Sequence, residues 1–164
     1  MTLERFNQAA AGDAIAQIAH CVALEEWASA LVANRPYHSR QALLHVAEGL
    51  THHWDERALN QALSAHPRIG EKAQGDGKEA GLSRKEQGQV NADDGALRQA
   101  LQAGNRAYEQ RFDRVFLIRA KGRSGEEILA ELQRRLNNPA SQELAEALAQ
   151  LREITLLRLQ ETFQ

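Results

Sequence analysis

Apolar residues recur along most of this chain at intervals of three, four and seven positions, the spacing that places side chains on one face of an α-helix. Each apolar series starts near a residue suited to capping a helix N-terminus; the candidates are Asp13, Ser39, Asp55, Ser83 and Ser124. Because proline does not fit inside a helix, the series are separated at Pro36, Pro67 and Pro139. The pattern predicts helices over residues 13–35, 39–54, 55–66, 83–112 with a pause near 93–95, 124–138 and 139–163.

Two segments depart from the helical pattern. Residues 70–81 hold four glycines among charged side chains, which predicts a long glycine-rich loop of the kind that is often functional. Residues 115–118 are a short apolar run with no second strand to pair with. This run is expected to be a buried extended connector or a distorted helix end, whose backbone groups bond to other parts of the protein.

Composition supports the helical interpretation. The chain of 164 residues has 28 Ala and 21 Leu, whereas Val, Ile and Thr together number 15, a balance that favours helices over strands. Apolar residues make up 43% and charged residues 26%, which are ordinary globular values. The expected fold is all-α: a single domain over residues 1–164, built as a bundle of about seven to nine helices with one long glycine-rich loop.

Charge and targeting signals narrow the function classes. The net charge of -2, without a clustered basic stripe, speaks against a nucleic-acid partner. No stretch approaches the roughly 20 apolar residues that span a bilayer, and the N-terminus lacks a signal-peptide pattern, so no membrane partner is expected. The single Cys21 cannot form an internal disulfide, which fits a cytoplasmic protein.

His66 is the first candidate for chemistry. It stands at the predicted end of a helix, followed by Pro67 and the glycine-rich segment, which would hold the imidazole at the edge of a cleft. Histidine is well suited to general acid-base catalysis near neutral pH. The alternative is that His66 only interacts with the helix C-terminus, where the helix dipole favours its charged form.

Glu86 is the second candidate. With Ser83 as the N-cap, Glu86 falls where its carboxylate can bond back to the cap, a capping box that needs no substrate. The same helix start, residues 83–87, also presents backbone N–H groups that favour an anion. Both roles are compatible.

Arg158 is the third candidate. It continues the apolar stripe of the C-terminal helix at a spacing of seven from Leu144 and Leu151. An arginine on an apolar face either reaches solvent or a Glu at the helix end, or bonds to a carboxylate, which an anionic substrate could supply.

Other kinds of site receive little support. His38, His45 and His52 recur at seven positions, unlike the tight pairs of zinc sites, so no metal site is expected. The chain also lacks a nucleophile elbow and a phosphate-binding glycine motif.

Several motifs together give a family resemblance. They are His66-Pro67-Arg68-Ile69-Gly70-Glu71, Ser83 to Gln87, Gly104-Asn105-Arg106-Ala107-Tyr108-Glu109, Arg111-Phe112, Phe116 to Ala120 and Gly122-Arg123-Ser124. In this order they resemble the OHCU decarboxylases, and the resemblance runs from about Phe6 to Leu159. It implies an all-helical enzyme of urate degradation that converts 2-oxo-4-hydroxy-4-carboxy-5-ureidoimidazoline (OHCU) into (S)-allantoin and carbon dioxide. It also implies catalysis without metal or organic cofactor, and a homodimer as a candidate assembly.

The resemblance assigns roles by position. His66 matches the family's catalytic proton donor, and Glu86 its acidic partner. The substrate-binding positions match Pro67, Ser83, Arg84, Lys85, Glu86, Gln87, Phe116, Leu117, Ile118, Arg119, Ala120 and Arg158. Asp113 departs from the pattern, since many relatives carry glycine there, and this puts only the local turn in doubt.

Two alternatives stay open at this point. The chain could be a helical module that binds allantoin-like ureides without turnover, in which case binding would not depend on His66. It could also catalyse another cofactor-free reaction on a related ureide, such as hydantoin ring opening, which product analysis would identify.

Overall fold

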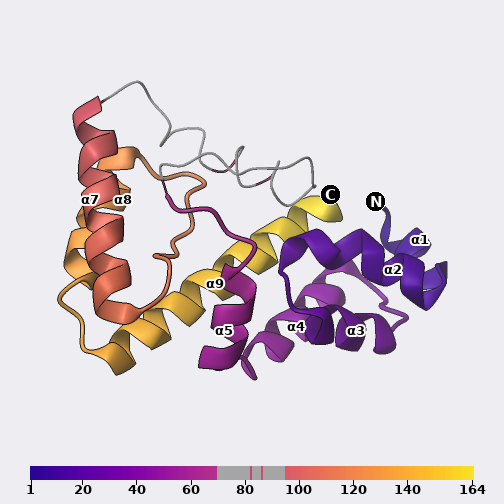
Figure 1. Ribbon diagram of the computed structural model, residues 1–164. Helices are drawn as coiled ribbons and strands as arrows, with labels where there is room; N and C mark the ends of the chain where they lie inside the picture. The colour runs from indigo at the N-terminus through magenta and orange to yellow at the C-terminus, as the bar shows by residue number, and fades with distance from the viewer. Residues whose placement is uncertain (70–81, 83–85, 87–94) are drawn as a thin grey trace. The chain divides into compact units, whose positions relative to one another are not determined.

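The computed structural model describes residues 1–69, 82, 86 and 95–164 (Figure 1). These residues contain no strand, which confirms the predicted all-α class. The helices with described bounds are α1 (Leu3–Gln8), α2 (Ala11–Ile18), η1 (Ala19–Cys21), α3 (Glu25–Ala33), α4 (Arg40–Thr51), α5 (Glu56–Leu63), α7 (Gly95–Phe112), α8 (Gly125–Arg135) and α9 (Ala140–Thr162). None of them is long and apolar enough to cross a membrane.

The chain divides into two compact units. The first comprises Met1–Ala62 with Arg152–Gln164, and the second comprises Leu63–Leu151. The long helix α9 therefore supplies its N-terminal half to the second unit and its C-terminal half to the first. That residues 1–164 form one domain stays a prediction.

In the first unit, the helices bury one apolar face each. The fully buried side chains include Phe6, Ile18, Leu31, Leu43, Leu59 and Leu159. The Trp27 indole in α3 donates to the carbonyl of Ala47 in α4 at 3.2 Å, which ties these two helices together. Phe6 meets the edge of Phe163 with ring centroids 5.2 Å apart, so the two ends of the chain share this core.

The predicted helix over residues 13–35 is wrong, because α2, η1 and α3 divide this segment. The carbonyls of His20 and Cys21 accept from the Arg158 guanidinium at 3.3 and 3.5 Å, and Val22 and Leu24 are extended. Bonds from another helix therefore take the place of the intrahelical ladder here. The predicted cap at Asp13 is also wrong, since α2 begins at Ala11.

Three predicted caps are confirmed by hydrogen bonds of the expected kind. The Ser39 side chain accepts from the backbone N–H of Ala42 at 3.0 Å. Asp55 likewise accepts from the N–H of Ala58 at 3.0 Å. In the second unit, Ser124 accepts from the N–H of Glu127 at 3.2 Å at the start of α8.

The core of the second unit lies between α7, α8 and the segment that links them. Its buried residues are Ile69, Leu97, Leu101, Tyr108, Phe112, Phe116, Ile118, Ala120, Ile128 and Leu132. Helix α7 approaches α8 closely at Gly104, where a Cβ would lie 2.5 Å from the Leu132 side chain. Glycine at this position lets the two backbones come together.

The predicted connector at residues 115–118 is confirmed as an irregular, largely buried segment between α7 and α8. The predicted glycine-rich loop over residues 70–81 and the helix cap at Ser83 lie outside the described residues. Leu82 and Glu86 are described, and both are helical.

Candidate active site

His66 lies three residues beyond the end of α5, on a short segment that leads to Ile69. Its backbone N–H donates to the carbonyl of Leu63 at 3.1 Å, the bond expected where a helix closes. The side chain is half-buried, and its Nε2 atom is fully buried. Pro67 follows with its restricted φ angle, so the backbone on both sides of the imidazole is constrained.

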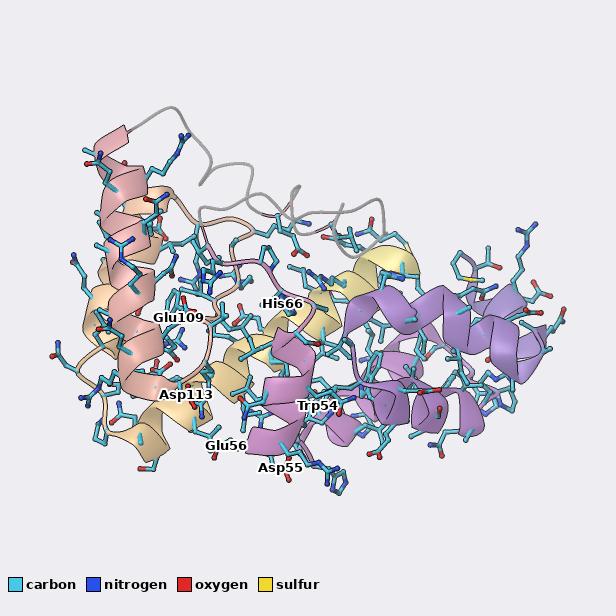
Figure 2. All side chains as sticks on the ribbon, viewed as in Figure 1. Trp54, Asp55, Glu56, His66, Glu109 and Asp113 are labelled. Carbon is cyan, nitrogen blue, oxygen red and sulfur yellow. The ribbon has the colours of Figure 1, made fainter. Side chains whose placement is uncertain are left out.

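Helix α7 holds the segment just after His66. The Asn105 side chain donates to the carbonyl of Ile69 at 2.8 Å. One turn further, Glu109 accepts from Nε and Nη2 of Arg68 at 2.8 and 2.9 Å, a two-bonded ion pair. Figure 2 shows His66 on the segment after α5 and Glu109 on α7. Two residues of one helix therefore bind two consecutive residues of the segment that carries the histidine.

The connector from Phe116 to Ala120 is anchored at several backbone groups. The carbonyl of Leu117 accepts from Nη1 of Arg135 at 2.8 Å, and the N–H of Arg119 donates to the Gln150 side chain at 2.8 Å. The Arg135 guanidinium also stacks over the Phe116 ring, 4.5 Å from its centroid. The irregular backbone of the connector therefore has hydrogen-bond partners on α8 and α9, as the sequence analysis predicts.

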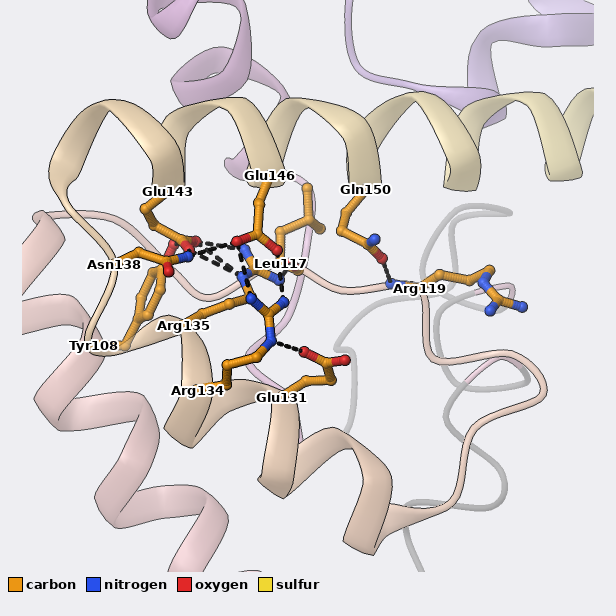
Figure 3. A network of polar contacts seen from close by, with 10 residues as sticks. All are labelled: Tyr108, Leu117, Arg119, Glu131, Arg134, Arg135, Asn138, Glu143, Glu146 and Gln150. Carbon is orange, nitrogen blue, oxygen red and sulfur yellow. Dashed lines mark hydrogen bonds and ion pairs between the residues drawn. The ribbon is translucent and has the colours of Figure 1, made fainter.

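A buried polar network supports this connector (Figure 3). Arg135 and Glu143 are 2% and 0% exposed, and the pair is joined by bonds that include one of 2.5 Å from Nη2 to Oε2. The Tyr108 hydroxyl donates to Glu143, and Asn138 donates to Glu143 Oε1 at 3.1 Å. The network therefore links α7, α8 and α9 to the Leu117 carbonyl.

Two members of this region have shifted pKa values. Burial, and then the hydrogen bond to Glu143, raises the pKa of Tyr108 well above its usual value, so the phenol keeps its proton and donates. At the exposed edge, hydrogen bonds from Arg134 lower the pKa of Glu146 from 4.5 to about 2.

Arg158 belongs to the first unit, in the C-terminal half of α9. It is 1% exposed, so the alternative in which its side chain reaches solvent is wrong. Its Nη1 atom lies 3.3 Å from the carbonyl of His20, in the weak range for a hydrogen bond. The His20 ring in turn bonds the Thr162 hydroxyl at 2.8 Å. A contact between Arg158 and a substrate stays a prediction.

Glu86 is helical and half-buried. Its interaction with His66 stays a prediction. The remaining residues of that predicted site, Ser83, Arg84, Lys85 and Gln87, lie outside the described residues.

In the part of the chain that the structure describes, no three His, Cys, Asp or Glu side chains lie close enough to share a metal ion.

Three residues that hold the site segments, Asn105, Arg135 and Gln150, were not singled out by sequence reasoning. Asn105 lies inside a quoted motif but received no role. The sequence did hold one signal for Asn105, because it is a lone amide on the apolar stripe of α7, near Leu101 and Tyr108. A buried amide must form a hydrogen bond with another group. No comparable signal marks Gln150.

Comparison with known proteins shows the family. The family model described as OHCU decarboxylase matches residues 7–160. The uric acid degradation bifunctional protein of Bacillus sp. (strain TB-90) is 25% identical over 171 residues, covering 100% of this chain and 32% of the relative. The chain thus spans about a third of the length of that relative.

Solved structures resemble the chain as well. The crystal structure of an OHCU decarboxylase in the presence of (S)-allantoin matches 88% of this chain and 95% of its own, at a TM-score of 0.74 and 25% identity. The crystal structure of an (S)-allantoin synthase matches 99% of this chain and 54% of its own, at a TM-score of 0.73. With 16% identity, the second match supports the fold alone.

Proposed function

The chain belongs to the OHCU decarboxylase family, and from this premise we propose that it converts 2-oxo-4-hydroxy-4-carboxy-5-ureidoimidazoline into (S)-allantoin and carbon dioxide. The match of the family model to residues 7–160 is the observation that carries the proposal. The motifs around His66 and Glu86, which resemble those of the family, support it.

The reaction sets the demands on the site. The carbon–carbon bond to the carboxylate breaks, carbon dioxide leaves, and the bonding electron pair enters the conjugated ring. One ring carbon then gains a proton, and the ring hydroxyl becomes the carbonyl as its proton passes to the ring nitrogen, which completes allantoin. Proton addition to one face of that carbon gives the S enantiomer. The enzyme must stabilise the negative charge that develops in the ring and place one proton donor on one face.

His66 is the proposed proton donor. A histidine titrates near neutral pH and can give up a proton and regain it from solvent in each cycle. Its place between the end of α5 and the segment bonded to α7 supports this role, because a proton donor must be held in one orientation to select one face.

The other residues of the proposal bind and orient. Glu86 would orient His66 and stabilise its charged form. Pro67, the backbone of residues 116–120 and the helix start at residues 83–87 would surround the substrate and donate to its oxygens. Arg158 would bind an anionic or carbonyl edge of the substrate.

The direct test follows the product by circular dichroism. The unstable substrate is generated in situ from urate, and the signal of (S)-allantoin is recorded with the purified protein. Without the enzyme, protonation on both faces gives a racemic product and no lasting signal. Growth of the S signal supports the proposal, and a trace identical to the uncatalysed one contradicts it.

Two variants test the roles of the acid and its partner. His66→Ala should lose at least about 100-fold in kcat, the scale of a general acid, with little change in melting temperature.

For Glu86→Gln a capping role predicts little kinetic loss, because glutamine also serves a capping box, whereas the charge role predicts a large loss.

Two implied properties belong to the same proposal. Catalysis without a metal predicts full activity after dialysis against EDTA, and lost activity that zinc or magnesium restores would contradict it. A homodimer predicts twice the chain mass of 18.2 kDa in light scattering, and a single chain mass would contradict it. The expected compartment is the cytoplasm.

A further inference from the structure

The position of the His66 imidazole depends on where residues 67–69 are fixed. On the N-terminal side, the N–H of His66 is bonded to Leu63. On the C-terminal side, the Ile69 side chain is 5% exposed and belongs to the core of the second unit. A histidine between two fixed points, next to a proline, has little backbone freedom.

Asn105 makes a buried polar contact to this segment. Its side chain is 2% exposed, and its Nδ2 atom donates to the Ile69 carbonyl at 2.8 Å. The amide lies among apolar neighbours on α7, including Leu101 and Tyr108. Because a buried N–H group is costly unless it donates, and a carbonyl can only accept, this pairing fixes which end of the Asn105 amide faces Ile69.

The Arg68–Glu109 ion pair is the weaker of the two contacts from α7. The side chains of Arg68 and Glu109 are 48% and 25% exposed, so water screens their attraction. They line an open groove of about 530 Å³, together with Gln102, Asn105, Arg106 and Gln110. Among these residues Asn105 is the buried one. Its bond to Ile69 therefore fixes the backbone of residues 67–69 more strongly than the exposed Arg68–Glu109 pair does.

We propose that Asn105 is a positioning residue of the decarboxylase, which fixes the proton donor His66 through the Ile69 carbonyl. The inference rests on the proposed function and adds a residue that acts on the reaction without touching the substrate. A small displacement of a proton donor lowers the rate of the chemical step while leaving substrate binding largely intact.

Asn105→Asp is the most direct test, because aspartate has nearly the same shape but its carboxylate cannot donate to a carbonyl. At pH 8 we expect kcat to fall about 10- to 100-fold while KM changes by less than about threefold. As the pH falls, the buried aspartate gains a proton, its O–H can again donate to Ile69, and the ratio of variant to wild-type kcat should rise.

The matched control is Asn137→Asp. Asn137 is exposed and bonds only within its own helix region, to the Gln133 carbonyl at 3.3 Å. The same change there should leave kcat, KM and the pH profile as in the wild type. Glu109→Gln should lower kcat by less than Asn105→Asp, because it weakens only the exposed contact.

The outcomes separate the inference from the proposed function. An Asn105→Asp protein that is folded and keeps wild-type kcat, or whose loss is entirely in KM, overturns the positioning role. If the wild-type protein shows no turnover, or if His66→Ala keeps full activity, the proposed function is overturned instead. If Asn105→Asp does not fold, Asn105→Ala introduces no charge and carries the same expectation for kcat at pH 8.

Discussion

Asp113 carries a positive φ of 56°, and no other non-glycine residue in the described part of the chain does so. It follows the last residue of α7, and its N–H donates to the carbonyl of Glu109 at 2.9 Å, which closes the helix end (Figure 2). Glycine is usual at such a position because a Cβ strains the left-handed conformation. The sequence had marked this departure from the family pattern, and the structure shows the strained turn to which it belongs.

Asp113→Gly should therefore stabilise the protein. Relief of the left-handed strain exceeds the extra entropy of glycine in the unfolded chain, and we expect a gain of about 0.5–1 kcal/mol. Urea unfolding measures it, with Gly122→Ala as the opposite control, since Gly122 has a φ of 81° and should lose stability. Equal or lower stability of Asp113→Gly would show that the aspartate side chain compensates for the strain.

Glu146 gives a prediction on pH. Its folded pKa of about 2 lies below its usual 4.5, so its contribution is complete above pH 4.5 and is lost as the pH falls toward 2. The melting temperature of Glu146→Gln should therefore lie slightly below that of the wild type at pH 7, and the gap should close between pH 4.5 and 2. The effect is small, because Arg134 is half exposed. A gap that stays constant over this range would contradict the assignment.

Site residues differ in how far sequence predicts them. His66 and Glu86 were singled out because each stands beside an expected helix boundary, at Pro67 and Ser83, and their catalytic roles stay predictions. Asn105 and Gln150 bond to residues 36 and 31 positions away, and no local pattern encodes such contacts.

At the scale of elements, α8 and α9 hold the connector at residues 116–120 in place through hydrogen bonds from the buried network and from Gln150. Arg135 bonds Glu143 and the Leu117 carbonyl at once, so its loss would remove both the positive charge that pairs with the buried Glu143 carboxylate and the donor to the Leu117 carbonyl. Its neighbour Arg134 points to the exposed edge, where it pairs with Glu131 and Glu146.

These adjacent arginines form a matched test. Arg135→Ala should lower the free energy of unfolding by about 3–5 kcal/mol, the cost of breaking a buried ion pair. Arg134→Ala should lower it by less than about 1 kcal/mol, as for exposed pairs. Urea titrations of both variants measure the difference, and similar losses would mean that burial does not determine the strength of this network.

Helix boundaries were predicted best where a capping residue within one turn determines them. Ser39, Asp55 and Ser124 cap helices as expected, because a cap is satisfied within one turn. The break between α2 and α3 was missed, because the carbonyls there are bonded by Arg158, 138 positions away from His20. A helix that ends on a tertiary contact keeps its apolar periodicity and carries no stop signal.

At the scale of the whole molecule, the residues predicted to act on the substrate are distributed over both units. His66 and the connector at residues 116–120 belong to the second unit, whereas Arg158 belongs to the first. The long helix α9 runs through both, so it connects Gln150, which bonds the connector, with Arg158. The all-α class could be predicted from composition, whereas contacts between residues far apart in the sequence depend on tertiary geometry that periodicity does not encode.

The central prediction is that one substrate contacts His66, Glu86 and Arg158. A crystal structure of the protein soaked with (S)-allantoin tests it most directly. The account predicts allantoin with a polar atom within about 2.7–3.2 Å of a His66 ring nitrogen, flanked by residues 83–87 and in contact with the Arg158 guanidinium. Allantoin bound away from His66, or His66 and Arg158 on separate surfaces of the molecule, would contradict it.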